Sequence, residues 1–435
     1  MLGFARIVGF SVDALGESCG ERTRQGGRAT RCVGSCYHWV VSEGSHANPG
    51  LEAMITRLLV CAALVGSVLS AQTTWIVNAG GGAGVHFADL PTAVAAASDG
   101  DTIVVQTGPF QEGATPFVTS KGLTIVGEGG LVPITTSLGN AIEIVNLPAT
   151  STFRMVGFSR LSNGALDVRV SNCAGKVHLE RMRCREPGAF LPVWPSVEIY
   201  NSDNVTMRQF ETFGSPCVQI DGSRVSMVSC RLGQTHIGLG GGQAVVANYS
   251  TVDIIEPLFE PVVAVAATVA VLQSDVRIAG SSGSLVNNGT GPAVLANGGS
   301  LLVDAAVEIT GVGLFGAAFA GSTPPTFASL PASSTGNANP GQALVLRTAA
   351  QASSLVFTAI GQPGFLLDTP LGTLGIAVSQ GYGFLPMTVV PALGPAQASL
   401  ALPAALPLGS AYTTQSVVFQ AGQLMISQPC TFVLH

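Results

Sequence analysis

Short alternations of apolar and polar residues recur through the middle of the chain, in two interleaved series. The first series is AIEIVN (141–146), ALDVRV (165–170), SVEIYN (196–201), CVQID (217–221), QAVVAN (243–248) and TVAVLQ (268–273). The second is TFRMVGF (152–158), KVHLERM (176–182), NVTMRQF (204–210), RVSMVSC (224–230), TVDIIEP (251–257) and DVRIAGS (275–281). Alternation with a period of two predicts strands that bury one face. Because each series returns every ~20 to 30 residues, the pattern predicts a solenoid with two clear strands in each turn and room for a third, weaker one.

The first turn of such a solenoid has an exposed edge and an open core end. The Ala-rich segment Ala88–Ala97 places Leu90, Val94 and several alanines on one side, which predicts a short helix that covers this end. Gly100 ends the helix, and Thr102–Gln106 is expected to form the first rung.

Three motifs follow one another at this point: GDTIVV (100–105), GPFQE (108–112) and KGLTIVG (121–127). Together with the Ala-rich helix, they resemble the N-terminal cap and first rung of right-handed parallel β-helix proteins of the pectate-lyase-like superfamily. The resemblance covers about residues 75–312 and implies an all-β, right-handed parallel β-helix with an N-terminal capping helix. That superfamily includes lyases, hydrolases, binding proteins and adhesins, so the resemblance does not select an activity.

The region before the solenoid predicts export. Residues 54–71 combine a basic start, an apolar core at Leu58–Leu69 and small residues before Gln72, which is the pattern of a signal peptide. Its apolar core is too short to span a membrane, so no membrane span is expected after cleavage. Residues 1–53 lack periodicity and are interpreted as an unstructured extension or a mis-assigned start. The mature protein is therefore expected to be secreted, either extracellular or at the cell surface.

A change in composition marks a second domain. Residues 313–341 are rich in Pro, Gly, Ser and Asn and are predicted to form a linker. Residues 342–435 hold alternating segments separated by Pro and Gly, which predict a small antiparallel β-sandwich. This segment resembles a C-terminal β-module found on secreted proteins of planctomycete-like bacteria, through Leu402-Pro403, TTQS (413–416) and FVL (432–434). The resemblance implies export but no activity.

Charge and cysteine usage narrow the classes of function. The net charge of −6 gives no basic footprint for nucleic acid. In an exported protein the pairs Cys173/Cys184 and Cys217/Cys230 are candidate disulfides, and inward-stacked thiols are the alternative. The region after residue 71 has no Cys/His spacing typical of a zinc site.

The first series yields the candidate ligand face. Aligning its strands places Glu143, Asp167 and Glu198 at equivalent outward positions, and Arg169, Tyr200 and Asp221 two residues further along. Neighbouring rungs lie ~4.8 Å apart, so three carboxylates on successive rungs are a candidate Ca²⁺ site. Tyr200 offers a ring for sugar stacking, with Trp194 as a second platform. The competing interpretation is a solvated column of ordinary surface charges.

The second series gives one outward column, formed by His178, Thr206, Ser226, Asp253 and Arg277. Asp253 with Arg277, and Glu180 with Arg208, are expected to form ion pairs between rungs. His178 is interpreted as a surface histidine.

These observations favour a non-enzymatic protein that binds polysaccharide or a cell-envelope component and needs no cofactor. The alternative is a Ca²⁺-dependent polysaccharide lyase or glycoside hydrolase acting on an acidic glycan, with Arg169 as the base of a lyase. The paired aspartates, Gly-His-Gly and Arg-x-Lys motifs of polygalacturonase-like enzymes do not occur in the repeat region, which weighs against the alternative.

Overall fold

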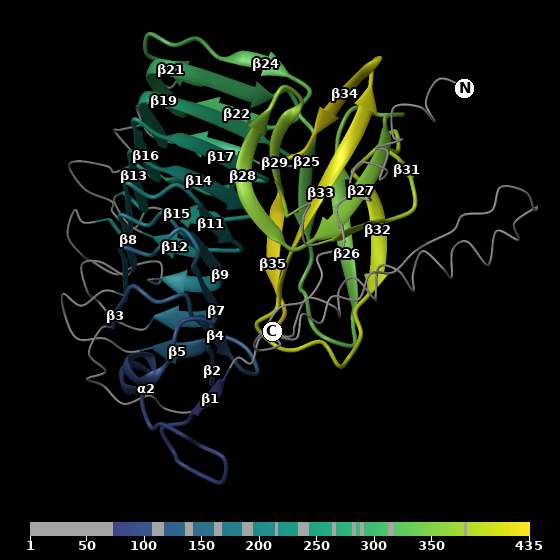
Figure 1. The fold of residues 1–435 in the computed structure, drawn as a ribbon. Helices are drawn as coiled ribbons and strands as arrows, with labels where there is room; N and C mark the ends of the chain where they lie inside the picture. Colours follow the sequence, from purple (N-terminus) through teal and green to yellow (C-terminus); the bar gives the residue numbers. More distant parts are fainter. Residues whose placement is uncertain are drawn as a thin grey trace, which may run out of the picture. The chain divides into compact units, whose positions relative to one another are not determined.

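The structure is a computed structural model of the 435-residue chain. It describes residues 73–106, 117–134, 142–160, 168–184, 195–213, 216–233, 243–262, 267–280, 284–287, 291–311, 317–377 and 381–435. The predicted N-terminal extension and signal peptide lie outside these residues. All described residues belong to one compact unit, which is almost entirely β-structure (Figure 1).

Residues 73–328 form a parallel β-solenoid, in which 24 strands are linked into one ladder. Its strands stack along three faces. The first face holds β3 (Val118–Thr119), β6 (Ile142–Val145), β8 (Val168–Ser171), β10 (Val197–Tyr200), β13 (Val218–Asp221), β16 (Val245–Asn248), the first halves of β19 (Val269–Ala279) and β21 (Val294–Asp304), and β23 (Phe319–Ala320). The predicted parallel β-helix is confirmed.

The second face is the longest stack and contains the second sequence series. It holds β1 (Thr74–Val77), β2 (Thr102–Val105), β4 (Thr124–Gly127), β7 (Thr152–Arg160), β9 (Lys176–Cys184), β11 (Val205–Arg208), β14 (Arg224–Val228), β17 (Thr251–Ile255), the second halves of β19 and β21, and β24 (Thr326–Ala328). A third face holds β5 (Val132–Ile134), the ends of β7 and β9, β12 (Glu211–Phe213), β15 (Arg231–Gly233), β18 (Leu258–Val262), β20 (Ser284–Asn287) and β22 (Glu308–Gly311).

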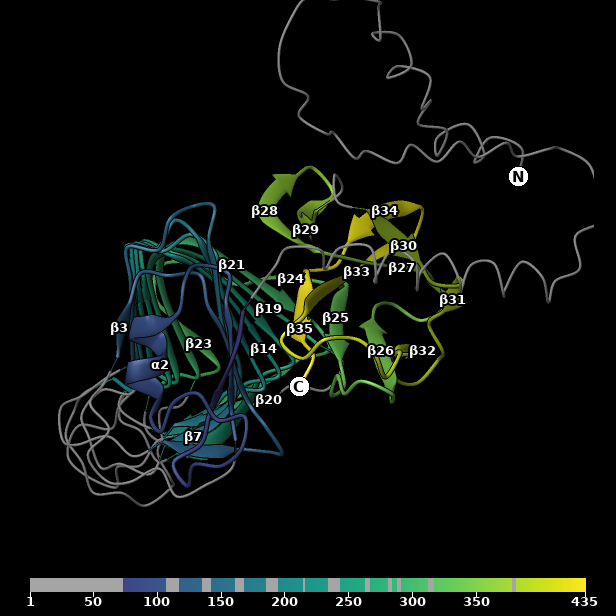
Figure 2. The ribbon, with the colours of Figure 1, turned by 60° about the horizontal axis from the view of Figure 1, so that its bottom comes forward.

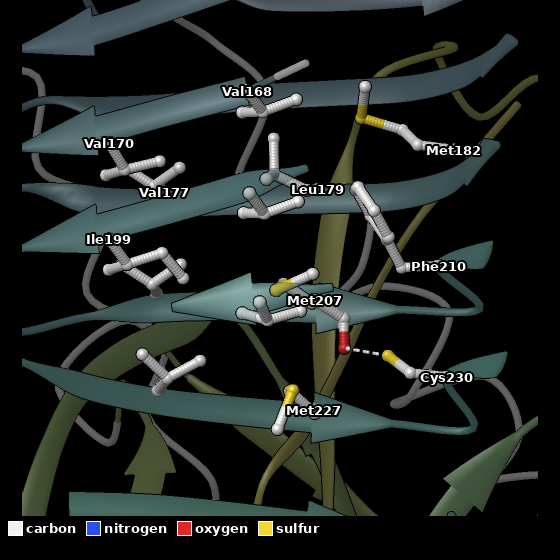
Figure 3. Close-up of a cluster of buried hydrophobic side chains, with 14 of the residues drawn as sticks. Val168, Val170, Val177, Leu179, Met182, Ile199, Met207, Phe210, Met227 and Cys230 are labelled. Atoms are coloured by element: carbon white, nitrogen blue, oxygen red, sulfur yellow. Dashed lines mark hydrogen bonds between the residues drawn. The ribbon is translucent and has the colours of Figure 1, made fainter. Parts of the chain in front are cut away.

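Along the first and second faces, alternate residues of most strands point into the coil and form one column of apolar side chains. Figure 3 shows part of this column, where Val170 and Ile199 of the first face lie near Leu179 and Met207 of the second. All four side chains are fully buried. Because no turn can bury its inner face alone, stacking supplies most of the stabilising burial.

A single helix closes the N-terminal end of the stack. Helix α2 (Leu90–Ala96) begins at the N-cap Asp89, whose side chain accepts a hydrogen bond of 2.8 Å from the Thr92 N–H. Leu90, Ala93 and Val94 pack into the solenoid core, and Figure 2 shows α2 in front of the stacked strands. The capping helix is confirmed. The prediction that Thr102–Gln106 starts the first rung is wrong, because β1 precedes the helix and pairs with β2.

Residues 332–435 form small antiparallel sheets. One sheet has the order β25 (Ala332–Thr335), β26 (Ala343–Ala349), β32 (Ala396–Ala401). A second has the order β30 (Tyr382–Phe384), β27 (Leu355–Gly361), β33 (Ala411–Gln420), β34 (Gln423–Ile426), with β31 (Thr388–Val389) on β27 and β35 (Cys430–Val433) on β33. β28 (Pro363–Thr369) and β29 (Gly372–Ile376) form a hairpin. We call residues 332–435 the C-terminal module. Within the segment predicted as a linker, β23 and β24 extend the parallel sheet and β25 belongs to the module.

The C-terminal module packs against the outward side of the second face. Val228, Ile255 and Ala279 of the solenoid share an apolar cluster with Ala332 and Cys430 of the module. Further along the face, Val156 packs with Ala411 and Val433. Outward residues of this face such as Ser226, Val228 and Ile255 are therefore buried, whereas the sequence pattern had suggested solvent.

Candidate functional site

The first face brings four polar residues into one outward row. Strand pairing places Glu143 opposite Arg169, Arg169 opposite Glu198, and Glu198 opposite Gln219. The predicted equivalence of Glu143, Asp167 and Glu198 is wrong, because Arg169 occupies the middle position. The error is a slip of two residues, which keeps every apolar side chain on the inner face and so leaves the alternation unchanged. Asp167 itself lies outside the described residues.

Arg169 joins the two carboxylates of this row. Its Nε and Nη2 each lie 3.0 Å from Oε2 of Glu198, and its Nη1 lies 3.8 Å from Oε1 of Glu143. The side chains of Arg169, Glu143 and Glu198 are 40%, 30% and 12% exposed. A guanidinium therefore occupies the space between Glu143 and Glu198 where the predicted Ca²⁺ would bind. Across the described ranges, no cluster of three or more His, Cys, Asp or Glu residues is arranged to hold a metal ion.

A second outward row on this face contains Tyr200, Asp221 and Asn248. Asp221 accepts hydrogen bonds from Nε2 of Gln219 at 2.9 Å and Nδ2 of Asn248 at 2.6 Å. Tyr200 is half-buried. Burial, the charges of Glu198 and Asp221 and a hydrogen bond from the Tyr200 hydroxyl to Glu198 raise the pKa of Tyr200 to about 12, so the phenol is neutral.

Among the described residues, an exposed aromatic ring lies at the end of this face, Tyr249, which the sequence reasoning missed. Tyr249 directly follows β16, is 65% exposed and has a φ of 50°. Asn172, Asn201 and Gly222 turn the chain with similarly positive φ at the ends of β8, β10 and β13. Asn and Gly tolerate this conformation better than Tyr. The position of Tyr249 could have been recognised by aligning YNS (200–202), DGS (221–223) and NYS (248–250), because each segment has a turn residue followed by a serine. Trp194, the predicted second platform, lies outside the described residues.

The serines that follow these turns form a buried ladder, which the sequence reasoning also missed. The hydroxyls of Ser202, Ser223 and Ser250 donate to the carbonyls of Tyr200, Asp221 and Asn248 at 2.8, 2.8 and 2.6 Å. The N–H groups of Ser202 and Ser223 donate to the next serine oxygen, each at 3.1 Å. The ladder satisfies the backbone where the coil turns between its first and second faces, and it holds the outward rows in register.

The second face has the register predicted from the sequence, but a different environment. His178, Thr206, Ser226, Asp253 and Arg277 lie opposite one another along the strands, as expected. However, His178 is only 4% exposed, so its interpretation as a surface histidine is wrong. The C-terminal module covers it.

Beside this column, Glu180 and Arg208 form the predicted ion pair, fully buried between the solenoid and the module. Glu180 also contacts Nε2 of His178 at 2.8 Å and accepts from the Val433 N–H at 2.9 Å. Burial alone raises the pKa of Glu180, but Arg208 and the hydrogen bond from His178 outweigh it and lower that pKa. Burial lowers the pKa of His178 despite the neighbouring carboxylate. The group therefore consists of an ionised Glu180, a charged Arg208 and a neutral His178.

The candidate disulfides are not formed. Among the described residues, all five cysteines are buried thiols: Cys173, Cys184, Cys217, Cys230 and Cys430. The structure thus supports the alternative of inward-stacked thiols. Cys173 occupies the position in the ladder that precedes Ser202, whose hydroxyl oxygen accepts from the Cys173 N–H at 3.2 Å.

Together, the fold and the first face define a parallel β-helix protein with an outward, partly exposed polar row and a C-terminal antiparallel module. No family model and no curated protein matches the chain. Among solved structures, it is similar to the full-length tailspike protein 2 of Escherichia coli O157:H7 bacteriophage CAB120, with 14% sequence identity and a TM-score of 0.17. The match covers 78% of this chain, which spans 55% of the tailspike chain. In the part of the chain that the structure describes, no helix has the length and apolar character needed to cross a membrane.

Proposed function

We propose that this chain is an exported, non-enzymatic β-helix protein that binds polysaccharide or a cell-envelope component through its first face. The observation that carries the proposal is the ordered outward row Glu143–Arg169–Glu198–Gln219. Rungs ~4.8 Å apart repeat hydrogen-bonding groups along a line, which suits a repeating polymer. Export rests on the signal-peptide pattern of residues 54–71.

The polar and aromatic groups of this face suit a sugar chain. Carboxylate, guanidinium and amide groups offer donors and acceptors to hydroxyls, and the exposed Tyr249 ring offers an apolar surface for a sugar face. Because Asp221 already bonds Gln219 and Asn248, these side chains are oriented before a ligand arrives.

The position of Arg169 favours binding over hydrolysis. A retaining glycosidase needs two carboxylates about 5 to 5.5 Å apart that are free to act as acid and nucleophile. Here the guanidinium of Arg169 bridges Glu143 and Glu198. A lyase using Arg169 as its base is the second candidate; it requires Arg169 to separate from Glu143 and Glu198 and lose its proton, because the two carboxylates favour the charged guanidinium.

The proposal is tested with a panel of acidic and neutral polysaccharides, each with calcium and with chelator. Tyr249→Ala should weaken binding of the recognised polymer roughly 2- to 10-fold, because a ring contact of this kind contributes ~0.5 to 1.5 kcal/mol. Tyr382→Ala, at an exposed tyrosine of the module, is the matched control and should bind like the parent chain. Failure of every polymer to bind would refute the proposal. Unsaturated products absorbing in the ultraviolet would establish the lyase instead.

A further inference from the structure

An open pocket of about 220 Å³ lies where the second face turns into the third. It is lined by Leu131, Arg181, Met182, Arg183, Gln209 and Glu211. β9 and β12 run side by side here, with Arg183 opposite Glu211 (Figure 1). A single water needs roughly 10 to 15 Å³ by the same kind of measure, so the pocket has room for a substituent of several atoms on a larger molecule.

The pocket is basic, although the chain as a whole has a net charge of −6. Arg181 and Arg183 line it with one carboxylate, Glu211, among the described residues. Both oxygens of this carboxylate already face guanidinium groups. Oε1 lies 2.9 Å from Nη1 of Arg231, and Oε2 lies 3.6 Å from Nε of Arg183. Three arginines thus surround a single carboxylate, and the excess positive charge attracts an anion from solvent.

Three side chains of the pocket have hydrogen-bond donors to offer a ligand. Nε of Arg183 is buried without a hydrogen-bond partner, because 3.6 Å to Glu211 is too long for a hydrogen bond. In the part of the chain that the structure describes, the side chains of Arg181 and Gln209 make no hydrogen bond to another residue. All three side chains are partly exposed, so a ligand can reach them from solvent.

The backbone at this corner is a second, independent observation. Arg181 and Gln209 both have a φ of 48°, in the left-handed region. Gly157 and Gly280 hold the same corner in other rungs, and glycine adopts this conformation without steric cost. Strained backbone positions concentrate at functional sites. Two long polar side chains kept at such positions, both lining the pocket, therefore indicate a role in binding.

We propose that this pocket binds a sulfate or phosphate ester carried by an anionic glycan. Arginine recognises oxyanions through paired, charge-assisted hydrogen bonds. The donors come from two rungs and from both sides of a corner, and a tetrahedral ester presents oxygens in more directions than a planar carboxylate. Leu131, which is 42% exposed, offers an apolar wall to the adjoining sugar.

The choice of a glycan as the carrier rests on the proposed function, whereas the choice of an oxyanion rests on the pocket alone. The pocket lies on the third face and shares no residue with the row Glu143–Arg169–Glu198–Gln219 of the first face. It is therefore a second site, and the two can be tested separately.

The test measures binding of the full chain to immobilised dextran sulfate, phosphomannan, polygalacturonate and unmodified dextran. Dextran sulfate or phosphomannan should bind more tightly than dextran, and this binding should weaken as salt is added, because the partners are charged. Polygalacturonate should bind more weakly than the ester polymers. Failure of both ester polymers to bind would overturn the proposal, and tighter binding of polygalacturonate would overturn the choice of an ester.

Arg181→Asn is the decisive variant, because it removes a guanidinium and also relieves the backbone. Asn adopts positive φ more readily than Arg, so the variant should melt no lower than the parent chain. It should nevertheless bind the ester polymer about 5- to 10-fold more weakly. If it fails to fold, Gln209→Asn, which shortens another donor of the pocket, should weaken binding in its place. Unchanged binding in a folded Arg181→Asn would overturn the proposal.

Two matched controls accompany this variant. Ser229→Asn changes the same corner one rung beyond Gln209, outside the pocket. Arg347→Gln removes an exposed arginine of the module. Both should bind the ester polymer like the parent chain. A loss in Arg347→Gln equal to that in Arg181→Asn would show nonspecific attraction to the polymer and would also overturn the proposal.

Tyr249→Ala separates this pocket from the first face. It should leave the binding of dextran sulfate unchanged, because Tyr249 does not line the pocket. If Tyr249→Ala weakens that binding and Arg181→Asn does not, the anion binds at the first face, which overturns the second site but not the proposed function.

Discussion

Arg208 on β11 pairs with Glu180 on β9, and both side chains are buried beneath the C-terminal module. Arg208 also donates to the carbonyls of Thr335 and Gly336, while Glu180 accepts from the Val433 N–H. Each member of the pair thus bonds to the module as well as to its partner. The ion pair is the polar centre of the contact between the solenoid and the module.

Replacing one member of this pair should lower the free energy of unfolding far more than replacing both. Arg208→Met leaves Glu180 buried without its counter-charge, and should lower the free energy of unfolding by ~3 to 5 kcal/mol. The double variant Glu180→Leu/Arg208→Met should recover part of this loss, because no buried charge remains. Urea denaturation measures both. Arg347→Gln, which is exposed, should stay within ~0.5 kcal/mol; an equally small effect of Arg208→Met would contradict the role of the pair.

Stability should decline as the pH falls below about 6.5. Burial lowers the pKa values of His178 and His435 in the folded chain, so the unfolded chain, with an ordinary histidine pKa near 6.5, takes up protons first. Stability rises with pH wherever the unfolded state binds more protons than the folded state. In this range the free energy of unfolding therefore decreases as the pH is lowered. Melting curves between pH 5 and 8 test this.

His178→Asn and His435→Gln should each flatten that pH dependence, whereas a substitution at the exposed His86 serves as the control. Below pH 4.5 a second loss of stability is expected. The pKa of Glu180 is lowered in the folded chain, so this carboxylate stabilises the fold only while it is ionised. A melting temperature that is constant from pH 8 to 5 would refute the burial of neutral histidines at this contact.

Each serine of the ladder should contribute substantially to the free energy of unfolding. Ser223→Ala removes the oxygen that accepts from the Ser202 N–H and the hydroxyl that donates to the Asp221 carbonyl. Because both backbone groups lie in a buried turn, the expected loss is ~1 to 3 kcal/mol. Ser300→Ala, at an exposed serine, should change stability by less than ~0.5 kcal/mol. Equal denaturation midpoints for the two variants would show that the ladder is not stabilising.

The cysteines should behave as buried thiols. Burial raises the pKa of Cys430 and raises that of Cys230 to about 12, so neither forms the reactive thiolate at neutral pH. A thiol reagent should label the five described cysteines slowly in the folded chain and fully after unfolding, with peptide mapping to separate them from the cysteines before residue 73. Reducing agent should leave the melting temperature unchanged, and a drop on reduction would indicate a disulfide.

Calcium should have no effect on the stability of the chain. Arg169 lies between Glu143 and Glu198, so a calcium ion at this position would be repelled by the positive charge of the guanidinium. Melting curves with millimolar calcium and with chelator should therefore superimpose. A calcium-dependent rise that is lost in Glu198→Gln would show that the cation displaces the guanidinium.

The sequence by itself determined the coil, its capping helix and the register of the second face. Alternation with a period of two decides which side chains enter the core, since a slip of one residue would expose all of them. His178, Thr206 and Ser226 fell into one column because clear valine positions precede each of them. The ion pair of Glu180 with Arg208 followed from the same register.

Only the tertiary structure decided which first-face residues meet and which second-face residues are buried. A slip of two residues leaves the apolar column intact, so alternation could not distinguish Arg169 from Asp167 as the partner of Glu143. Nor does a strand's pattern reveal whether its polar side faces water or another polar surface. Val433 bonds to Glu180 from 253 residues away, and that contact depends on how two separately patterned segments pack together.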